Sequence, residues 1–362
     1  MSRPYSIRVD HESESPPFEA PTAPTIRPDL APAFHGARVL ITGGLGFIGS
    51  NLARELVGCG AHVTLVDSLI DEYGGNLFNI AGIEDEIAVN ISDVRDEHSL
   101  RYLVRDQDYL FNLAGQTSHL DSMLAPYNDL EINCRSQLSI LEACRHQNPD
   151  IRIVFASTRQ IYGRPQQLPV DEQHPIQPVD VNGINKTAGE WYHLLYGDVY
   201  GLSVSVLRLT NTYGPRMRVK DARQTFLGYW LRLMVSGVSL DVYGDGRQRR
   251  DLNYVDDAVA AFLLAATRDE AVGQVYNLGD ADPISLAELA QLLVELNGDG
   301  GWQLVPFPPD RKAIDIGDFW ADFGKIERGL GWRPTVELRD GIATTLRYYR
   351  EHGATHYWDD AS

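Results

Sequence analysis

A cluster of glycines directly after a short apolar run constrains the fold of this chain more than any other feature. The run, residues 38–42, is rich in β-prone residues and predicts a buried strand. The turn that follows it contains Gly43, Gly44, Gly46 and Gly49. Apolar residues then recur at helical spacing over 50–57. Glycine permits a tight turn, lets the backbone approach a pyrophosphate and allows a helix to pack closely on a strand. This order of elements therefore predicts a dinucleotide site, with the phosphates at the N-terminus of the helix.

A carboxylate ends the next predicted strand. Residues 62–66 form a short, mostly apolar run, and Asp67 follows it. A carboxylate at this place hydrogen-bonds the ribose hydroxyls of adenosine and repels a 2′-phosphate. Because no arginine directly follows Asp67, the sequence favours NAD over NADP.

Strand and helix patterns alternate through the first part of the chain. Further strands are predicted at 87–90, 109–113, 151–156 and 203–209, with helices near 130–146 and 184–200. Such alternation predicts an α/β fold with a Rossmann-type, doubly wound parallel sheet. After about residue 210, helices near 222–235, 255–268 and 285–297 mix with short strands at 240–243 and 274–278. We expect a smaller C-terminal α/β lobe there.

These patterns divide the chain into four parts. Residues 1–36 are rich in Pro, Ser and Glu and predict a disordered extension, with a packed strap as the alternative. Residues 37–209 form the expected NAD-binding domain. Residues 210–350 form mainly the substrate-binding lobe, although parts of this stretch could return to the first domain. A tail is expected over 351–362.

The composition argues against several classes of binding partner. The 362 residues carry 32 Lys and Arg against 50 Asp and Glu, a formal charge of −18. This acidity argues against a nucleic-acid partner, which requires clustered basic residues. No run approaches the length of about 18 apolar residues that a membrane span needs. The three cysteines show no metal-ligand spacing, and no signal peptide is apparent, so we expect a cytoplasmic protein without a metal.

Further motifs extend from about Ala37 to Tyr349. In chain order they are Gly43-x-x-Gly46-x-x-Gly49, Asp93-Val94, Asn112-Leu113-Ala114-Gly115-Gln116, Asn133, residues 155–163, residues 208–215, residues 250–257 and residues 321–334. Together they resemble the extended short-chain dehydrogenase/reductase family of nucleotide-sugar epimerases and dehydratases.

The resemblance implies NAD as cofactor and a nucleoside-diphosphate sugar as substrate. The residues implied for NAD are Gly43, Gly46, Phe47, Ile48, Gly49, Asp67, Asp93, Val94, Leu113, Ala114, Gln116, Asn133 and Lys186. Those implied for the substrate are Ser118, Thr158, Arg159, Gln160, Asn211, Arg216, Arg218, Arg250 and Lys312. In this family NAD takes a hydride from the sugar, normally at C4. A tyrosine removes the hydroxyl proton, assisted by a lysine four residues later and by a Ser or Thr.

The expected tyrosine is missing. Lys186 and Thr158 match the pattern, but Asn182 stands four residues before the lysine, and no tyrosine occurs between Gly163 and Trp191. Asparagine has no accessible pKa, so it can orient a hydroxyl or a water but cannot act as a general base. His119 has a suitable side chain for proton transfer. The alternative is a solvent-facing loop histidine.

A second departure follows Thr158. Dehydratases of the family place two acidic residues there, whereas this chain has Arg159 and Gln160. This difference argues against a standard 4,6-dehydratase. Arg159 either pairs with an anionic group of the substrate or is an ordinary surface arginine.

The sequence therefore predicts an NAD-dependent epimerase, most simply at C4 through a transient 4-keto sugar, with an atypical proton relay through Thr158, Lys186, Asn182 and His119. The alternatives are a related dehydratase or reductase, and a protein that binds NAD and a nucleotide sugar without turnover. The resemblance also implies a homodimer formed by segments 120–146 and 184–200. Alternatively, the apolar faces of these segments only cover the sheet within one subunit.

Overall fold

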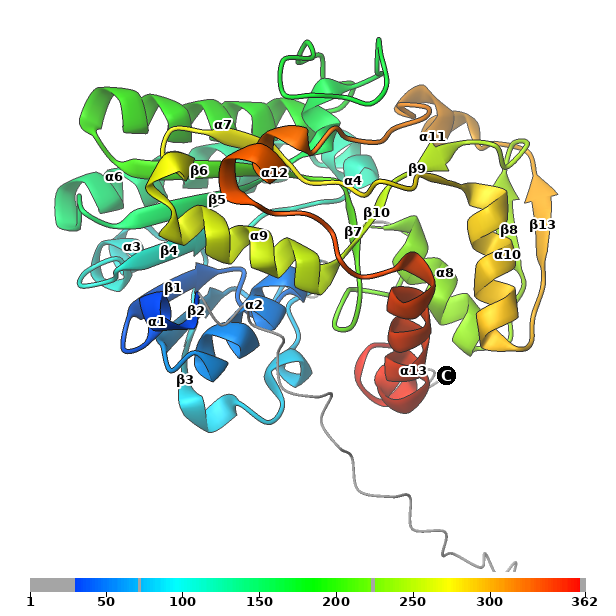
Figure 1. Ribbon diagram of the computed structural model, residues 1–362, viewed down its shortest axis with the longest axis horizontal. Coiled ribbons are helices and arrows are strands. Elements are labelled where there is room, and N and C mark those ends of the chain that lie inside the picture. Colours follow the sequence, from blue (N-terminus) through cyan, green and yellow to red (C-terminus); the bar gives the residue numbers. More distant parts are fainter. Residues whose placement is uncertain (1–29, 71–72, 223–224, 359–362) are drawn as a thin grey trace, which may run out of the picture.

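The structure, a computed structural model, describes residues 30–70, 73–222 and 225–358. A parallel sheet with helices on both faces forms one lobe, and a smaller lobe of short strands and helices lies beside it (Figure 1). Residues 1–29 of the predicted extension lie outside the described part. No helix among the described residues is long and apolar enough to cross a membrane.

The central sheet has seven parallel strands. These are β1 (Arg38–Thr42), β2 (His62–Asp67), β3 (Ile87–Ile91), β4 (Tyr109–Asn112), β5 (Arg152–Thr158), β6 (Ser203–Leu209) and β11 (Val275–Asn277). Their order across the sheet is β11-β6-β5-β4-β1-β2-β3, and neighbours pair in parallel. The chain runs outward from β1 to β3 and then returns to β4. A crevice opens outside the carboxyl ends of the strands at this reversal, where ligands bind in such sheets. The predicted doubly wound sheet is confirmed.

Two hydrophobic cores lie on opposite faces of the sheet. Successive side chains of a strand point to opposite faces, so Ile41 joins one core and Leu40 the other. On the Ile41 side the covering helices are α2 (Phe47–Gly58) and α9 (Val255–Thr267). On the Leu40 side they are α3 (Glu97–Leu103), α6 (Ser136–Gln147) and α7 (Val181–Tyr200).

Helix α7 begins earlier than predicted. The Asp180 side chain accepts a hydrogen bond from the Gly183 amide at 2.7 Å, which caps the helix. Its last turn closes at Gly201, whose φ of +75° suits glycine. The predicted start at 184 missed one turn, because this turn contains the polar but buried Asn182 and the weak helix former Gly183. Asn182 therefore lies in the first turn of the helix.

The smaller lobe is built from short strand pairs and helices. The pairs are β7 (Asn211–Tyr213) with β10 (Leu252–Tyr254), β9 (Arg249–Arg250) with β12 (Ile284–Ser285), and β8 (Leu240–Tyr243) with β13 (Trp302–Val305). The helices are α8 (Phe226–Val235), α10 (Leu286–Asn297), α11 (Pro309–Ala313), α12 (Gly324–Leu330) and α13 (Leu338–His356). Residues 255–277 depart from the simple division at 210, because α9 and β11 belong to the sheet lobe.

Both ends of the described chain are more ordered than predicted. The short helix α1 (Ala31–Phe34) precedes Ala37, and Phe34 is fully buried with its ring centroid 5.0 Å from that of Tyr109. Helix α13 continues to His356, and Trp358 is buried after it. Regular structure therefore begins before residue 37 and continues beyond residue 351, because buried aromatic side chains anchor both segments.

Candidate active site

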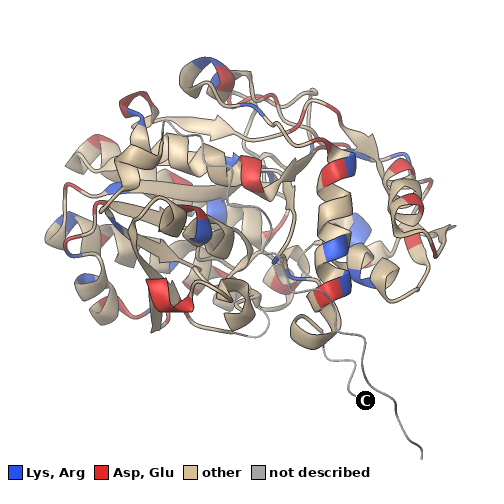
Figure 2. Ribbon diagram, turned by 60° about the horizontal axis from the view of Figure 1, so that its bottom comes forward, with Lys and Arg blue, Asp and Glu red and all other residues tan. Residues whose placement is uncertain are grey.

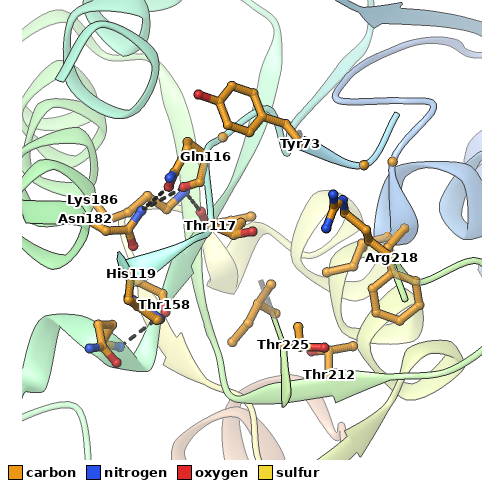
Figure 3. Close-up of a pocket in the computed structure, with 18 of the residues that line it drawn as sticks. Tyr73, Gln116, Thr117, His119, Thr158, Asn182, Lys186, Thr212, Arg218 and Thr225 are labelled. Atoms are coloured by element: carbon orange, nitrogen blue, oxygen red, sulfur yellow. Dashed lines mark hydrogen bonds between the residues drawn. The ribbon is translucent and has the colours of Figure 1, made fainter. Parts of the chain in front are cut away.

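One cavity lies at the carboxyl ends of the central strands and between the two lobes. The turn after β1, the ends of β4 and β5, the start of α7 and parts of the smaller lobe line it. Figure 3 shows His119, Thr158, Asn182 and Lys186 on one side of this cavity and Arg218 on the other.

The glycine turn after β1 lines one part of the cavity. Gly43 has a φ of +69°, and its amide donates to the Val66 carbonyl at 2.8 Å. A Cβ atom at Gly49 would lie 2.3 Å from the Gly43 carbonyl oxygen. Only glycine lets α2 start this close to the turn. Gly43, Gly46, Phe47, Ile48 and Gly49 all line the cavity. The turn and the helix N-terminus fit the pyrophosphate of NAD.

Two acidic residues, Asp67 and Asp93, line the cavity at the end of β2 and after β3. The Asp67 carboxylate accepts hydrogen bonds from the Leu45 amide at 3.0 Å and the Leu69 amide at 2.9 Å. Burial raises the pKa of Asp67, although these amide bonds oppose the shift. Asp93 and Val94 line the same cavity. Hydrogen bonding from Arg95 lowers the pKa of Asp93 despite partial burial.

The segment after β4 crosses the middle of the cavity. Its Leu113 and Ala114 amides donate to the Thr42 hydroxyl, each at 3.2 Å. Leu113, Ala114 and Gln116 line the cavity, as predicted. Asn133 does not line it. Its side-chain amide donates to the Gln116 carbonyl at 2.8 Å, so it holds the lining segment from behind.

Lys186 of α7 contacts strand β5, and Thr158 is the last residue of that strand. The Lys186 ammonium donates to the Ala156 carbonyl at 2.7 Å and lies 4.7 Å from the centroid of the Phe155 ring. Burial lowers the pKa of Lys186 to about 8, while Asp129 and Glu190 act in the opposite direction. The Thr158 hydroxyl accepts from the Gln160 amide at 3.2 Å at the end of β5.

A buried aspartate that the sequence did not single out holds Asn182. The Asn182 side-chain amide donates to the Gln116 carbonyl at 2.7 Å and to Asp129 at 3.1 Å. Asp129, in α5 (Pro126–Leu130), is 1% exposed and also accepts from the amides of Asn133 and Asn185. Asp129 does not line the cavity. Its place four residues before Asn133 is the one local signal that could have pointed to it.

His119 belongs to a pair with a second buried aspartate. It begins α4 (His119–Leu124), lines the cavity, and places Nδ1 3.0 Å from Oδ2 of Asp180. The Asp180 carboxylate also accepts from the Gln160 side-chain amide at 2.7 Å. Burial opposes its ionisation, but the bonds from His119, Gly183 and Gln160 together lower the pKa of Asp180. His119 therefore lies at the start of a helix beside a carboxylate, and its side chain is 33% exposed.

The predicted substrate residues divide into two groups. Those that line the cavity are Thr158, Arg159, Gln160, Asn211, Arg218 and Arg250. Ser118, Arg216 and Lys312 do not. Ser118 caps α4, and the Arg216 guanidinium donates to Asn51 at 2.8 Å and lies over the Tyr348 ring. Lys312 lies over Phe307, while the neighbouring Arg311 lines the cavity instead.

Positive charge at the cavity comes from Lys186 and from individual arginines, since acidic and basic residues are interspersed over both lobes (Figure 2). Arg218 pairs with Asp221 through two bonds of 2.9 and 3.0 Å. Arg250 donates to the carbonyls of Arg249 and Gly317, and its guanidinium lies 3.7 Å from Asp315.

Comparison with known proteins agrees with this geometry. The model of the NAD-dependent epimerase/dehydratase family matches residues 39–279. A dTDP-glucose 4,6-dehydratase of Streptomyces griseus is 31% identical over 89% of this chain and 96% of its own length. The structure of a UDP-glucose 4-epimerase of Thermotoga maritima with UDP-glucose has a TM-score of 0.77 at 29% identity, covering 87% of this chain and 99% of that one. A dTDP-glucose 4,6-dehydratase of Streptomyces venezuelae, solved with NAD bound, has a TM-score of 0.81 at 28% identity, covering 89% and 99%.

Proposed function

Because the chain belongs to the NAD-dependent epimerase/dehydratase family, we propose that it epimerises a nucleoside-diphosphate sugar at C4 through a transient 4-keto sugar, with His119 as the proton acceptor. NAD is the cofactor, and when bound it supplies the acceptor and donor of the hydride. The observation that carries the proposal is the His119–Asp180 pair, which lines the same cavity as Thr158 and Lys186.

Each of these side chains has a separate task. Thr158 holds the sugar hydroxyl by a hydrogen bond. Lys186 supplies positive charge near the carboxyl end of β5. Asp180 lies 3.0 Å from Nδ1 of His119, which leaves Nε2 as the ring nitrogen that accepts the hydroxyl proton.

Asn182 is a positioning residue in this scheme. Its side-chain amide is engaged with Gln116 and Asp129. It therefore holds the segment carrying Gln116 and leaves the proton to another group. Arg159 and Gln160 support epimerisation over 4,6-dehydration, because neither is a carboxylic acid that could remove the C5 proton or protonate the departing oxygen.

The test compares His119→Gln and Asp180→Asn with the unmodified protein. Asparagine caps helices about as well as aspartate, so Asp180→Asn removes the charge beside His119 while α7 keeps its cap. C4 epimerisation is followed on UDP-, GDP-, CDP-, ADP- and dTDP-sugars by product analysis. We expect His119→Gln to lower turnover by roughly 10²–10⁴-fold and Asp180→Asn to lower it by less, with NAD affinity retained in both.

The matched control is His146→Gln, because His146 is exposed on α6 and does not line the cavity. Turnover in this variant should equal that of the unmodified protein. Undiminished turnover of His119→Gln would show that another group accepts the proton.

A further inference from the structure

Arg159 carries a buried donor without a partner. Its Nη1 atom is buried and has no hydrogen-bond partner within the described residues. The other terminal nitrogen, Nη2, donates to the neutral side chain of Asn211 at 2.9 Å. The guanidinium lies 5.2 Å from the centroid of the Phe319 ring, and the residue lines the cavity. A buried, unsatisfied donor is costly unless a ligand completes it.

The charges around Arg159 do not neutralise it. Burial and the like charge of Arg250 lower the pKa of Arg159 to about 10, although Asp251, Asp315 and Asp180 act in the opposite direction. Among the described residues, no carboxylate lies within 4.0 Å of its guanidinium. Two of the three carboxylates have other partners: Asp180 pairs with His119, and Asp315 lies 3.7 Å from Arg250 and accepts from Gln248.

Asp251, the third carboxylate, offsets only a small part of the positive charge of Arg159. Asp251 is completely buried, its Oδ2 accepts from the Ala321 amide at 3.0 Å, and its Oδ1 has no partner within the described residues. Burial raises the pKa of Asp251 to about 7, so near neutral pH much of this group carries no charge. Among the described residues, Arg159 therefore has no ion-pair partner of its own, and the like charge of Arg250 acts against it.

The position of Arg159 places this charge at the sugar end of the cavity. It directly follows Thr158, the residue that holds the sugar hydroxyl in the proposed function. Arg218, beyond the middle of the cavity, already has a bidentate carboxylate partner. An anion bound by Arg159 would lie beside the reacting sugar.

We propose that the Arg159 guanidinium binds a carboxylate of the sugar, so that the substrate is the nucleoside-diphosphate derivative of a sugar acid. This inference rests on the proposed function, because it takes Thr158 to face the sugar. Guanidinium is suited to this role because its planar fork matches a carboxylate and remains charged throughout the physiological pH range. The other anion in such a substrate is the diphosphate, and the experiment separates the two.

The experiment measures binding rather than turnover. UDP, UDP-glucose and UDP-glucuronate are titrated calorimetrically into the NAD-loaded protein, and GDP, GDP-mannose and GDP-mannuronate form a second series. The series whose nucleotide binds is then repeated with Arg159→Gln and Arg159→Lys. We expect the unmodified protein to bind the sugar acid at least about tenfold more tightly than the neutral sugar, because a hydrogen bond to a charged group is involved.

Arg159→Gln should remove this preference and leave the affinities for the nucleotide and the neutral sugar within about twofold. Arg159→Lys should retain part of it, because lysine keeps the charge but not the planar fork. Arg247→Gln is the control, since the Arg247 side chain is 89% exposed and does not line the cavity. Thermal unfolding and NAD affinity check that each variant is folded.

The opposing outcomes are distinct. If Arg159→Gln lowered the affinities for the nucleotide, the neutral sugar and the sugar acid by the same factor, Arg159 would be assigned to the diphosphate and the inference would be overturned. Unchanged binding of all three would mean that Arg159 is a hydrated arginine, which also overturns it. Failure of UDP-, GDP-, CDP-, ADP- and dTDP-sugars alike to bind the unmodified protein would contradict the proposed function itself.

Discussion

The ammonium of Lys186 lies where its charge is disfavoured. Burial lowers the pKa of Lys186 to about 8, so the side chain is charged below that pH and becomes neutral above it. We therefore expect turnover to fall as the pH rises through about 8, because the positive charge of Lys186 at the carboxyl end of β5 is lost. In Lys186→Arg, which retains its charge, this descending limb should move above pH 10, although lower geometric fit reduces the maximum rate.

The measurement is kcat/KM from pH 6 to 10, with Lys220→Arg as a control at an exposed lysine outside the cavity. The same pKa has a consequence for stability. Between about pH 8 and the ordinary lysine pKa, the unfolded chain holds this proton and the folded chain does not, so Lys186 makes unfolding less favourable as the pH rises. A descending limb that persists near pH 8 in Lys186→Arg would assign it to another group.

The choice of dinucleotide depends on one carboxylate. Asp67 lines the cavity at the end of β2, and Gly75 passes so close that a Cβ atom there would lie 2.7 Å from Oδ1 of Asp67. We expect Asp67→Asn to weaken NAD binding and to reduce the discrimination against NADP, because the repulsion of a 2′-phosphate is lost. Titration with both dinucleotides measures the ratio, and Asp150→Asn, at an exposed position, should leave it unchanged. Equal affinity of the unmodified protein for NADP and NAD would contradict the role of Asp67.

At the scale of elements, helix α7 presents a polar face to the interior. Asn182, Lys186, Glu190 and His193 recur about one turn apart and are each less than 10% exposed. Glu190 pairs with Arg208 at 2.5 Å, and the His193 ring stacks on Phe155 with a centroid distance of 4.1 Å. The helix thus holds the site by hydrogen bonds and ion pairs where most helices use apolar packing.

The contact between α2 and the glycine turn gives a prediction at this scale. Because a Cβ atom at Gly49 would overlap the Gly43 carbonyl, we expect Gly49→Ala to push α2 away from the turn. The free energy of unfolding should fall by about 1–3 kcal/mol, and NAD binding should weaken. Chemical denaturation and NAD titration measure the two effects.

The matched variant is Gly301→Ala. A Cβ atom there meets only ordinary contact, 3.4 Å from the Ser239 hydroxyl oxygen, so stability should change little and NAD binding should be unaffected. Equal stability and NAD affinity of the two variants would mean that the close approach at Gly49 has no energetic role.

At the scale of the whole molecule, exposed apolar side chains gather on α4, α5 and α7. Leu124 is 83% exposed, Tyr127 82%, Ile184 55%, Trp191 57% and Leu195 51%. Such a concentration is typical of an interaction surface. By contrast, Leu138, Leu141 and Leu194 pack against the sheet core. The alternative that these helices cover the sheet therefore describes one part of their apolar residues, and the other part is exposed.

We predict a homodimer formed by this surface. Trp191→Glu combined with Leu195→Glu should dissociate it, because two charges would be buried without partners. Light scattering at micromolar concentration measures the mass. Val238→Glu is the control, since Val238 is 48% exposed next to β8 in the smaller lobe. A monomer mass for the unmodified protein would contradict the prediction.

The sequence by itself determined the parts of this protein that depend on local pattern. The strand, glycine turn and helix at 38–58, the alternation of elements and the parallel sheet follow from residue type and spacing over a few positions. The cavity-lining residues after β1 and at the end of β2 follow as well, because the carboxyl ends of parallel strands meet at one edge. Those at the ends of β4 and β5 were indicated by the family resemblance.

Only the tertiary structure decided which side chains become partners. Asp129 lies 53 residues from Asn182, and Asn51 lies 165 residues from Arg216. Periodicity carries no information about such pairs, since packing of whole elements brings them together. The same packing placed Asp180 beside His119, turned Arg216 away from the cavity, and left Arg159 with an unfilled donor. Hydrogen bonds act over about 3 Å, so a shift of one helical turn would have changed every one of these partners without changing the pattern of the sequence.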